Sequence, residues 1–574
     1  MKSIAGISRR EVIVWPIRLA VASGLGLVNP APGHSGSSSV QCDAPRYGRL
    51  KDVNTTDFKE AIRLGCHTMQ SVFNADDNDV PFMLARARPD ARLAFYPGGS
   101  EAHVPGRHLN ALLNAEDAAG IVIDEQAIEK HRRAAFFSFS GPVSLPLNRQ
   151  VMDGPLVNFA AHNIREGLHA LCALVKFRRD DRARELAEAC IAAIFDLWGP
   201  QCGWDEERLK RHGINHMDRH ENFVRTLPRA LGPLVKYYRA TGYGPALELA
   251  FVLKEKLLAE HFREDGVYDI QVQGTHGHSI ACVLSSMAQM AELTQDLPLI
   301  RRVKAFYDNG MWKLRDELGW VVEKTGDSAV KRPDLGEANS TGDLIETALI
   351  LGRLGHPQYF EDAERMLRCH LLPSQLRDIG FITAPANPQN EDGKRDVARR
   401  LQGAYGFPAP YGHEPLELEG FEGVNFNLDI VGGVVGSLCE VYRDATRLDA
   451  TGHHVNLLFD HETEAIKVES IYTHPQMRVI LKKPEPLWVR LPPWVRRDRL
   501  SLEGVAGMPR LKSSHAFVGQ QPVGRPVTFR FDLPTRDIVL RHPTRSIRVR
   551  LRGDAVAAMD HFGADLTFFE PLEG

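Results

Sequence analysis

The sequence predicts a large helical domain, closed into an α/α toroid, followed by a smaller β-sandwich domain. Two observations predict this fold. Apolar residues recur at helical spacing from about residue 155 to 445, and the apolar period changes from 3.6 to 2 after about residue 450. The 574 residues also exceed the roughly 250–300 at which a single hydrophobic core stops growing. We expect a leader and linker over residues 1–41, the toroid over 42–450 and the β-sandwich over 451–574.

The first forty residues have the layout of an export signal. Arg9 and Arg10 precede the apolar run Val12–Val28, and a stretch rich in Pro, Gly and Ser follows. This order is typical of a twin-arginine signal peptide. Arg18 interrupts the run and leaves it too short to cross about 30 Å of hydrocarbon. We therefore expect an exported protein, periplasmic or secreted, with no integral membrane span in the mature chain.

The charge of the chain argues against nucleic acid as a partner. Residues 1–41 contain four basic residues and one acidic residue, so their removal takes the formal charge from −3 to −6. A mildly acidic protein offers phosphate backbones little to bind.

The eight cysteines are scattered, with no CxxC pair and no Cys/His cluster at zinc spacing. An exported protein can form disulfides, but most of these cysteines fall within helical apolar patterns, which predicts small buried side chains.

Paired antiparallel helices recur about every 55–65 residues. In one pair, Leu231 and Tyr238 share an apolar face, Gly242 stops the helix, and Pro245 opens its partner. No strand-like alternation interrupts this region, which disfavours a parallel α/β sheet. The long Pro- and Gly-rich loop 381–427 favours closure into a toroid over an open solenoid. The apolar faces expected next are Ile280, Leu284, Met287 and Ala291; Leu299, Val303 and Phe306; Leu344, Ala348 and Leu351; and Tyr359, Ala363 and Met366.

The C-terminal region alternates apolar with polar or basic residues, and Pro/Gly clusters separate the alternating segments. This pattern is typical of a β-sandwich. The opening segment, about 43–150, is mixed, and we expect it to hold the first helical hairpins. The expected strands are Val455–Phe459, Ala465–Ser470, Met477–Leu481, Leu487–Leu491, Val527–Leu533, Asp537–Leu540 and Ser546–Leu551.

Five short motifs occur in a fixed order between residues 150 and 555. They are Gly277-His278-Ser279, Gly336-Glu337-Ala338-Asn339, Glu364-Arg365-Met366-Leu367, Val455-Asn456-Leu457-Leu458 and Leu487-Trp488-Val489-Arg490-Leu491-Pro492. In this order and on this architecture, they resemble the β-L-arabinofuranosidases of glycoside hydrolase family 127. The resemblance implies an (α/α)6 toroid whose central hollow binds the end of a sugar chain, followed by β-sandwich modules.

The resemblance also implies a catalytic apparatus that this chain carries only in part. Members with known chemistry hold a cysteine nucleophile on zinc with a glutamate and three cysteines, and use a second glutamate as acid/base. Glu337 matches the glutamate ligand, but Asn339 stands where a ligand cysteine belongs, and Asp429–Gly433 has no sulfur where two cysteines belong. An amide and glycines neither bind zinc nor supply a nucleophile, so we predict no metal and no cofactor. Three acids lie in the loop of the acid/base glutamate without a firm match: Glu323, Asp327 and Asp334.

A pair of carboxylates is the simplest replacement for the zinc-bound cysteine. We predict Glu337 and Asp429 as this pair, one donating a proton to the leaving oxygen and the other activating water or attacking directly. Both also suit a helix start, where acids are favoured for structural reasons. His278 is the third predicted catalytic residue, since Gly277 lets the backbone approach a ligand and His278 would point into the hollow. The structural alternative is a buried histidine that bonds a backbone carbonyl.

The densest polar cluster, Asn215–Asn222, precedes an inner helix and could hold substrate hydroxyls, a proton relay or a metal. Its alternative is a solvated loop whose acids cap the helix. Sugar rings stack on aromatic faces, so we predict the loop Tyr405–Glu414 as a lid or subsite wall, although each aromatic could equally belong to the core. The predicted substrate-binding residues are Asn339, His216, Asp218, His220, Arg225, Trp320, Tyr405, Tyr411 and His413.

These observations predict an exported glycoside hydrolase that acts on a plant- or algal-type polysaccharide or oligosaccharide by carboxylate acid/base catalysis. One alternative is a polysaccharide lyase, with His278 as base and Asn339 or Arg225 neutralising a uronate carboxylate. Another is a carbohydrate-binding protein without catalysis. The predicted site requires that the helix starts near residues 278, 337 and 429 meet around one hollow.

Overall fold

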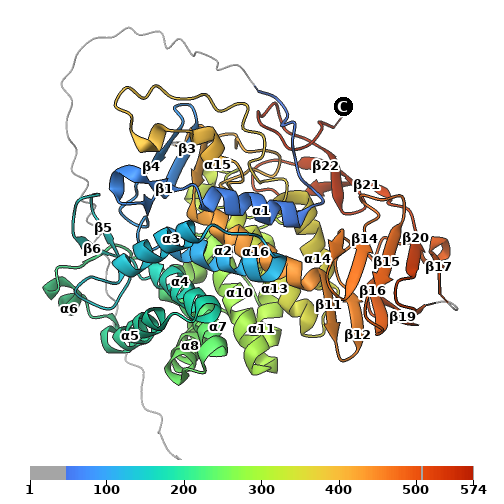
Figure 1. Cartoon of the computed structure of the whole chain (residues 1–574), viewed down its shortest axis with the longest axis horizontal. Helices are drawn as coiled ribbons and strands as arrows, with labels where there is room; N and C mark the ends of the chain where they lie inside the picture. The colour runs from blue at the N-terminus through green and yellow to red at the C-terminus, as the bar shows by residue number, and fades with distance from the viewer. Residues whose placement is uncertain (1–46, 420, 506–508, 573–574) are drawn as a thin grey trace, which may run out of the picture. The chain divides into compact units, whose positions relative to one another are not determined.

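Six inner helices form a closed ring. Each packs against its two ring neighbours, and the last helix, α16, packs against the first, α2 (Figure 1). This closure confirms a toroid and excludes an open solenoid. The inner helices are α2 (Val104–Ala119), α4 (Asn163–Arg178), α7 (Leu231–Thr241), α10 (Gly277–Thr294), α13 (Ala338–Arg353) and α16 (Asp429–Ala445).

An outer helix covers each inner helix, which completes the (α/α)6 arrangement. In ring order from α2 to α16, the outer partners are α3 (Glu125–Ser138), α5 (Asp181–Leu197), α8 (Gly244–Lys256), α11 (Leu297–Asp308), α14 (Tyr359–Met366) and α1 (Phe58–Met69). Four short helices lie in the connections: α6 (Glu206–Arg211), α9 (Ile270–Gln273), α12 (Asp327–Lys331) and α15 (Val397–Leu401).

The computed structural model describes residues 47–419, 421–505 and 509–572, which cluster as one unit. The predicted leader, residues 1–41, lies outside the described residues. We call residues 47–445 the helical domain and 446–572 the β domain, because α16 ends at Ala445 and the strands of the C-terminal region begin at Thr446.

Local sequence sets the ends of the helices. Outer helices begin with aspartates whose side chains accept a backbone N–H of the first turn, as Asp180 accepts from Ala183 and Asp296 from Leu299. Gly242 ends α7 in the left-handed region with φ of 72°, as expected. Leu231 and Tyr238 both lie in α7, and a 3-10 turn over Leu227–Ala230 precedes it.

No strand was expected between about residues 155 and 445, and this was wrong. Short strands, of two to five residues, form small sheets between the helices there and in the opening segment, and runs this short carry too little alternation to be recognised. They are β1 (Phe73–Asn74), β2 (Val80–Pro81), β3 (Leu84–Arg88), β4 (Arg92–Ala94), β5 (Leu147–Arg149), β6 (Leu156–Phe159), β7 (Trp198–Gly199), β8 (Gly203–Trp204), β9 (Asn215–His216) and β10 (Val424–Asn427).

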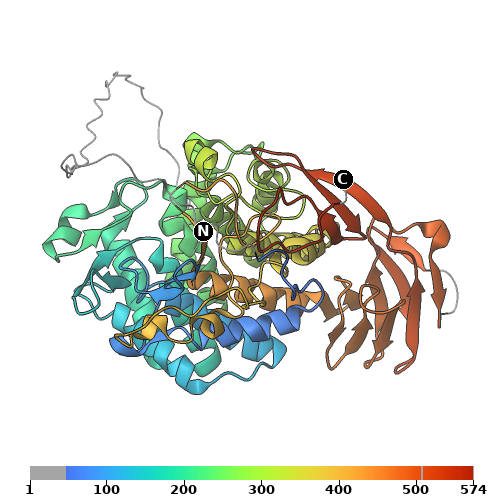
Figure 2. The same ribbon diagram turned by 90° about the horizontal axis from the view of Figure 1, so that it is seen from above.

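The β domain contains two five-stranded sheets and one three-stranded sheet, drawn in orange to red (Figure 1, Figure 2). The first sheet, in spatial order, is β11 (Thr446–Asp449), β12 (Gly452–Val455), β16 (Pro486–Arg490), β19 (His515–Gln520) and β18 (Arg510–Lys512). The second is β13 (His461–Glu462), β14 (Ile466–Glu469), β15 (Met477–Leu481), β20 (Pro526–Arg530) and β17 (Ser501–Glu503). The third is β21 (Thr535–Leu540), β22 (Ile547–Arg552) and β23 (Ala555–Met559).

Alternating burial explains how these sheets pack. Val489 of the first sheet and Val479 and Phe529 of the second belong to one hydrophobic cluster. The third sheet instead contributes Ile547 and Val549 to the large core of the helical domain.

Among the described residues, no helix combines the length and the hydropathy that crossing a bilayer requires.

A buried ion network joins the two domains. The Arg490 guanidinium of β16, which is 1% exposed, bonds to both Glu361 and Glu364 of α14. Arg368 donates to Glu364 over 2.8 Å and to the carbonyl oxygen of Leu458 over 2.6 Å. The β domain is therefore held against the ring by charge as well as by apolar packing.

Candidate functional site

Polar side chains from the starts of all six inner helices gather at one end of the ring. Unlike the aspartates of the outer helices, most of these side chains do not cap their helices, which leaves them free to face one another. Six aligned helix N-termini also create a positive potential there, which favours acidic side chains and anions. The residues at or next to these starts are His103, His162, Arg229, His276, Glu337 and Asp429.

His278 lies at the centre of the first group of contacts. Its Nδ1 is 3.3 Å from Oε1 of Glu337, and its Nε2 is 3.2 Å from Nδ2 of Asn339 and 3.3 Å from Oδ2 of Asp343. Burial lowers the pKa of His278 well below its usual range, so the ring is neutral. The Asn339 amide nitrogen donates to Nε2, and burial raises the pKa of Asp343 to about 7, so that its carboxyl group can donate to Nε2 as well. When Asp343 is protonated, His278 accepts at Nε2 and holds its proton on Nδ1, facing Glu337.

Glu337 is a carboxyl group held in its protonated form. Burial raises its pKa to about 8, and repulsion from Asp429 and Glu323 acts in the same direction. Although Glu337 is the N-cap residue of α13, its side chain makes no capping hydrogen bond. It lies 3.7 Å from Nε2 of His276 instead. Glu337 therefore lies at the helix start without capping the helix.

Asp429 has the opposite protonation state. Burial alone would raise its pKa, but His103 and Arg107 outweigh burial and hold the pKa at about 2. Oδ2 of Asp429 is 3.1 Å from Nε2 of His103 and 3.5 Å from Nη1 of Arg107. Asp429 is the first residue of α16 and Leu428 is its N-cap, so Asp429 does not cap this helix.

Two further contacts bring the starts of α13 and α16 together. A Cβ placed on Gly433 would lie 3.0 Å from Cβ of Asn339 and 2.8 Å from Nη1 of Arg107. Arg107 thus lies beside both Asp429 and the residues that contact His278. The three helix starts that the sequence singled out, near residues 278, 337 and 429, meet in one cluster.

Three arginines surround a single buried glutamate beneath this cluster. Oε1 of Glu166 is 3.1 Å from Arg107, 3.0 Å from Arg165 and 3.6 Å from Arg229. Burial would raise the pKa of Glu166, but His103 and the three guanidinium groups hold it well below its usual range. Arg107 also faces Asp429 over 3.5 Å, and Arg165 faces Asp343 over 3.7 Å, so the three guanidinium groups link Glu166 to the carboxyl groups of the cluster.

The polar loop before α7 joins the same region through Asp218. Its carboxylate is 3.0 Å from Nε2 of His216 and 3.0 Å from Nδ1 of His162, and it accepts the backbone N–H of Ala161 over 2.8 Å. The ring of His162 lies 5.5 Å from that of His103. Asp218 therefore fixes the start of α4 rather than capping the helix that follows it, and the solvated-loop alternative fails for His216 and Asp218.

The remaining predicted binding residues lie at the edge of the cluster or away from it. The charge of Arg225 acts on both His276 and Glu323, which places it at the edge. His220 is exposed and bonds its neighbour Arg219, and Arg225 pairs with Glu221 over 2.6 Å. The prediction of an aromatic wall was wrong. The four side chains are all buried in packed structure: Trp320, Tyr405, Tyr411 and His413. Nε1 of Trp320 donates to the carbonyl of Pro408, and the hydroxyl of Tyr411 bonds Asp334, so neither offers a free face to a sugar.

Several residues of the cluster were not among the predicted site residues. Glu323 lies 4.0 Å from Nε2 of His276, its Oε2 has no hydrogen-bond partner, and burial raises its pKa. The sequence showed Glu323 only as one of three acids in a loop. His103, Arg107 and Glu166 carried no motif, and only the ring closure that brings α2 and α4 beside α16 reveals them.

The residues present do not fit the zinc of family 127. Asn339 and Gly433 meet where the resemblance would place thiolate ligands, and neither residue supplies sulfur. Throughout the described ranges, no group of three or more His, Cys, Asp or Glu side chains could hold a metal ion. The site instead offers a protonated carboxyl, an ionised carboxylate and neutral histidines, which are the groups that proton transfer requires.

Solved structures share this fold. A glycoside hydrolase family 127 β-L-arabinofuranosidase from Geobacillus stearothermophilus T6 matches over 88% of this chain and 86% of its own, with 14% identity and a TM-score of 0.53. A second family 127 β-arabinofuranosidase matches over 89% of this chain and 84% of its own, with 13% identity and a TM-score of 0.55. The chain has a distant family 127-like fold. No family model and no curated protein sequence matches it.

Proposed function

We propose that this protein is an exported glycoside hydrolase that uses Glu337 as general acid and Asp429 as base or nucleophile. One observation supports this most strongly: two carboxyl groups at adjacent inner-helix starts have pKa values of about 8 and about 2. Glycoside hydrolysis needs one protonated and one ionised carboxyl group at neutral pH, and a pair whose environments drive their pKa values apart meets that need.

In the proposed reaction, Glu337 transfers its proton to the glycosidic oxygen as the bond from that oxygen to the anomeric carbon breaks. Asp429 then either removes a proton from a water that attacks the anomeric carbon, or attacks that carbon itself. His103 and Arg107 keep Asp429 ionised for either role. His278 orients Glu337 through its Nδ1 proton.

The substrate class and the export route are part of the proposal. The similar structures are named as β-L-arabinofuranosidases, which supports arabinose-containing plant polysaccharides and oligosaccharides as the first substrates to screen. The paired arginines Arg9 and Arg10 support export through the twin-arginine route. Replacing both with lysine should leave the protein in the cytoplasm, as measured by cell fractionation; equal export of the variant would contradict this.

The deciding experiment screens the purified protein against plant and algal polysaccharides and reads released reducing ends. We expect Glu337→Gln and Asp429→Asn to lower kcat at least 100-fold, because each removes one of the two protonation states that the reaction uses. Glu464→Gln, at an exposed position of the β domain, is the matched control and should stay within twofold of the parent. Turnover that survives in both site variants would exclude this pair.

The same screen tests the other two candidate functions. A neutral His278 in contact with Asn339 is also the arrangement that a lyase would use on a uronate, with His278 removing the proton. New absorbance from an unsaturated product, without hydrolytic products, would choose the lyase. Sugar binding without any product, unchanged in Glu337→Gln, would instead choose a binding protein.

A further inference from the structure

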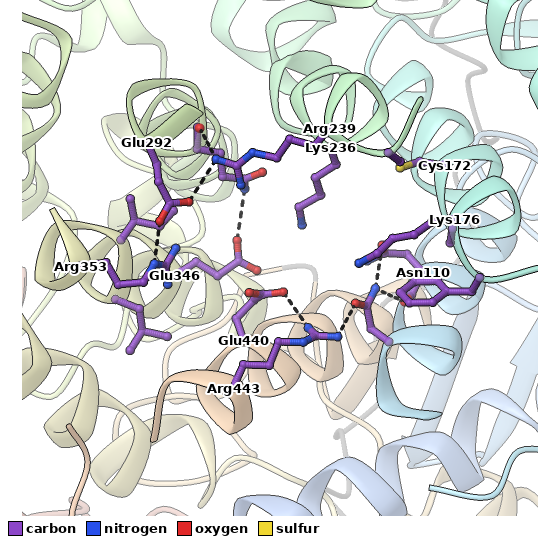
Figure 3. A pocket seen from close by; sticks show the side chains of 17 residues that line it. Asn110, Cys172, Lys176, Lys236, Arg239, Glu292, Glu346, Arg353, Glu440 and Arg443 are labelled. Atoms are coloured by element: carbon purple, nitrogen blue, oxygen red, sulfur yellow. Dashed lines mark hydrogen bonds and ion pairs between the residues drawn. The ribbon is translucent and has the colours of Figure 1, made fainter. Parts of the chain in front are cut away.

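A cavity lies at the opposite end of the ring from the candidate site. Its volume is about 280 Å³, and every inner helix contributes to its lining (Figure 3). Most of the lining side chains come from the carboxyl half of their helix, and 11 residues, or about 16 Å of helix, separate Gln289 from His278 on α10. One lining residue from each inner helix, in ring order, is Asn110, Lys176, Lys236, Gln289, Glu346 and Glu440.

The acids of this cavity are all occupied. Glu292 pairs with Arg239 over 3.2 Å and with Arg353 over 2.6 Å, while Glu440 pairs with Arg443 over 3.0 Å. These pairs form the rim of the cavity in Figure 3. Their mutual neutralisation holds the arginine side chains in place.

Glu346 is likewise engaged, by neutral donors. It accepts hydrogen bonds from the hydroxyls of Ser285 and Ser437 over 3.0 and 3.1 Å. Because hydroxyls carry no charge, Glu346 keeps its negative charge. The lining still holds five basic side chains against three acids, an excess of two positive charges.

Two lysines remain without an acidic partner among the described residues. Lys236 is half-buried and its side chain is directed into the cavity, as Figure 3 shows. Lys176 enters from α4, where its ammonium group lies 4.4 Å from the centre of the Phe177 ring. Cations near a helix C-terminus can simply complement the helix dipole, which accounts for Lys176 in the last turn of α4. Lys236 lies before the last turn of α7, so the dipole does not account for it.

Gln289 supplies an independent sign of a missing ligand. Its side chain is 9% exposed, and Oε1 has no hydrogen-bond partner although it is buried. Its Nε2 is within 3.4 Å of both Ser285 and Glu346, which leaves Oε1 as the free acceptor. A buried acceptor without a donor costs about 1–3 kcal/mol, so a ligand hydroxyl at this position would be stabilising.

We propose that this cavity binds a small organic anion of monosaccharide size that carries a carboxylate or phosphate and at least one hydroxyl. Lys236 and Lys176 bind the anionic oxygens, and Oε1 of Gln289 accepts the hydroxyl. The volume lies at the lower end of the range of about 300–1,000 Å³ typical of ligand pockets, which limits the ligand to about one sugar ring. A neutral sugar would leave the excess positive charge of the lining in place. The proposal does not depend on turnover at the other end of the ring.

Calorimetric titration of the full-length protein with glucuronate, glucose 6-phosphate and neutral glucose tests this site. We expect one of the two anions to bind and glucose not to bind, and the binding to weaken with added salt. Lys236→Met should weaken binding at least tenfold, whereas Lys236→Arg, which keeps the charge, should stay within about threefold of the parent. Lys210→Met, on the exposed face of α6, is the matched control and should bind as the parent does.

The two anions distinguish the carboxylate from the phosphate. Equal affinity in Lys236→Met and the parent, or no binding of either anion, would overturn the proposal. Loss of binding in Asp429→Asn but not in Lys236→Met would place the anion in the candidate catalytic cluster and would overturn it as well.

Discussion

At the scale of single residues, the environments of Glu337 and Asp429 determine how the proposed activity should depend on pH. Glu337 stays protonated below a pKa of about 8, and Asp429 stays ionised above about 2. Both carry the required charge between these values. We expect kcat/KM to be high near neutral pH and to fall as pH rises through about 8, because Glu337 then loses the proton it must donate. Initial rates from pH 5 to 10 measure this, and a profile that is flat beyond pH 9 would exclude Glu337 as the acid.

The same raised pKa predicts an effect on stability. A carboxyl group whose pKa rises from 4.5 to about 8 on folding binds its proton more tightly in the folded chain, so its contribution to stability is lost as pH rises from 4.5 to 8. Glu337→Gln cannot ionise. Its free energy of unfolding should therefore exceed that of the parent at pH 9 by an amount on the order of a few kcal/mol, and by much less at pH 4. Urea unfolding at the two pH values measures this, with exposed Glu464→Gln expected to match the parent at both.

Residues near a recognisable motif could be predicted for the cluster, and residues without one could not. His278, Glu337 and Asn339 follow glycines or helix-start patterns in the sequence and do lie in contact. Arg107 and Glu166 sit inside ordinary helical patterns, where a charged residue usually faces solvent. Only the closed ring turns them inward.

At the scale of the helix, close approach of backbones explains which glycines are required. A Cβ on Gly106 of α2 would lie 2.0 Å from the carbonyl oxygen of Glu166 of α4, and backbone cannot move aside. On Gly436 of α16, the nearest atom would be Nδ2 of Asn110 at 3.5 Å, an ordinary contact. The two helical glycines therefore form a matched pair.

We expect Gly106→Ala to destabilise the protein by about 1–3 kcal/mol, because the α2 and α4 backbones must separate. Gly436→Ala should stabilise it by about 0.5–1 kcal/mol, because alanine loses less backbone entropy in a helix. Chemical denaturation followed by circular dichroism measures both variants. Equal effects of the two substitutions would contradict the close packing of α2 against α4.

The helix pairs, whose partners are adjacent in sequence, could be predicted, and the short strands between them could not. The turn at Gly242 and the helix that Pro245 opens lie where the sequence placed them. Strand β10 pairs with β3, more than 300 residues away, and has only four residues. Neither its length nor its alternation distinguishes it from a loop.

At the scale of the whole molecule, the ion network of Arg490 should couple the unfolding of the two domains. Arg490→Met leaves Glu361 and Glu364 buried with too little positive charge, which costs about 3–5 kcal/mol when one partner of a buried pair is removed. Arg496→Met removes an arginine that is more than half exposed and pairs with Asp498, and should leave the free energy of unfolding almost unchanged, because water screens such a pair.

Thermal unfolding followed by near-ultraviolet and far-ultraviolet dichroism separates these outcomes. The parent should unfold in one transition, and Arg490→Met should unfold at a lower temperature. An unchanged melting temperature in Arg490→Met would mean that the apolar contacts alone hold the β domain to the ring.

The order of the domains could be predicted from the change of period near residue 450, because each period reports local geometry. The third sheet could not be predicted as part of the helical core. Its apolar residues, such as Ile547 and Val549, alternate with polar ones as in any other strand. That alternation does not indicate which part of the molecule the sheet packs against.

The pairing of α2 with α16 has a consequence for how the protein is made. Until the ribosome has finished α16, the earlier helices can form only an open crescent with its apolar seam exposed to water. The backbone N–H of Leu50 also bonds the carbonyl of Thr567, so Leu50 cannot reach its final contacts until Thr567 has been made. Such distant contacts slow folding and leave a nascent chain open to aggregation. We therefore expect the nascent chain to need protection from aggregation until almost all of it has been synthesised.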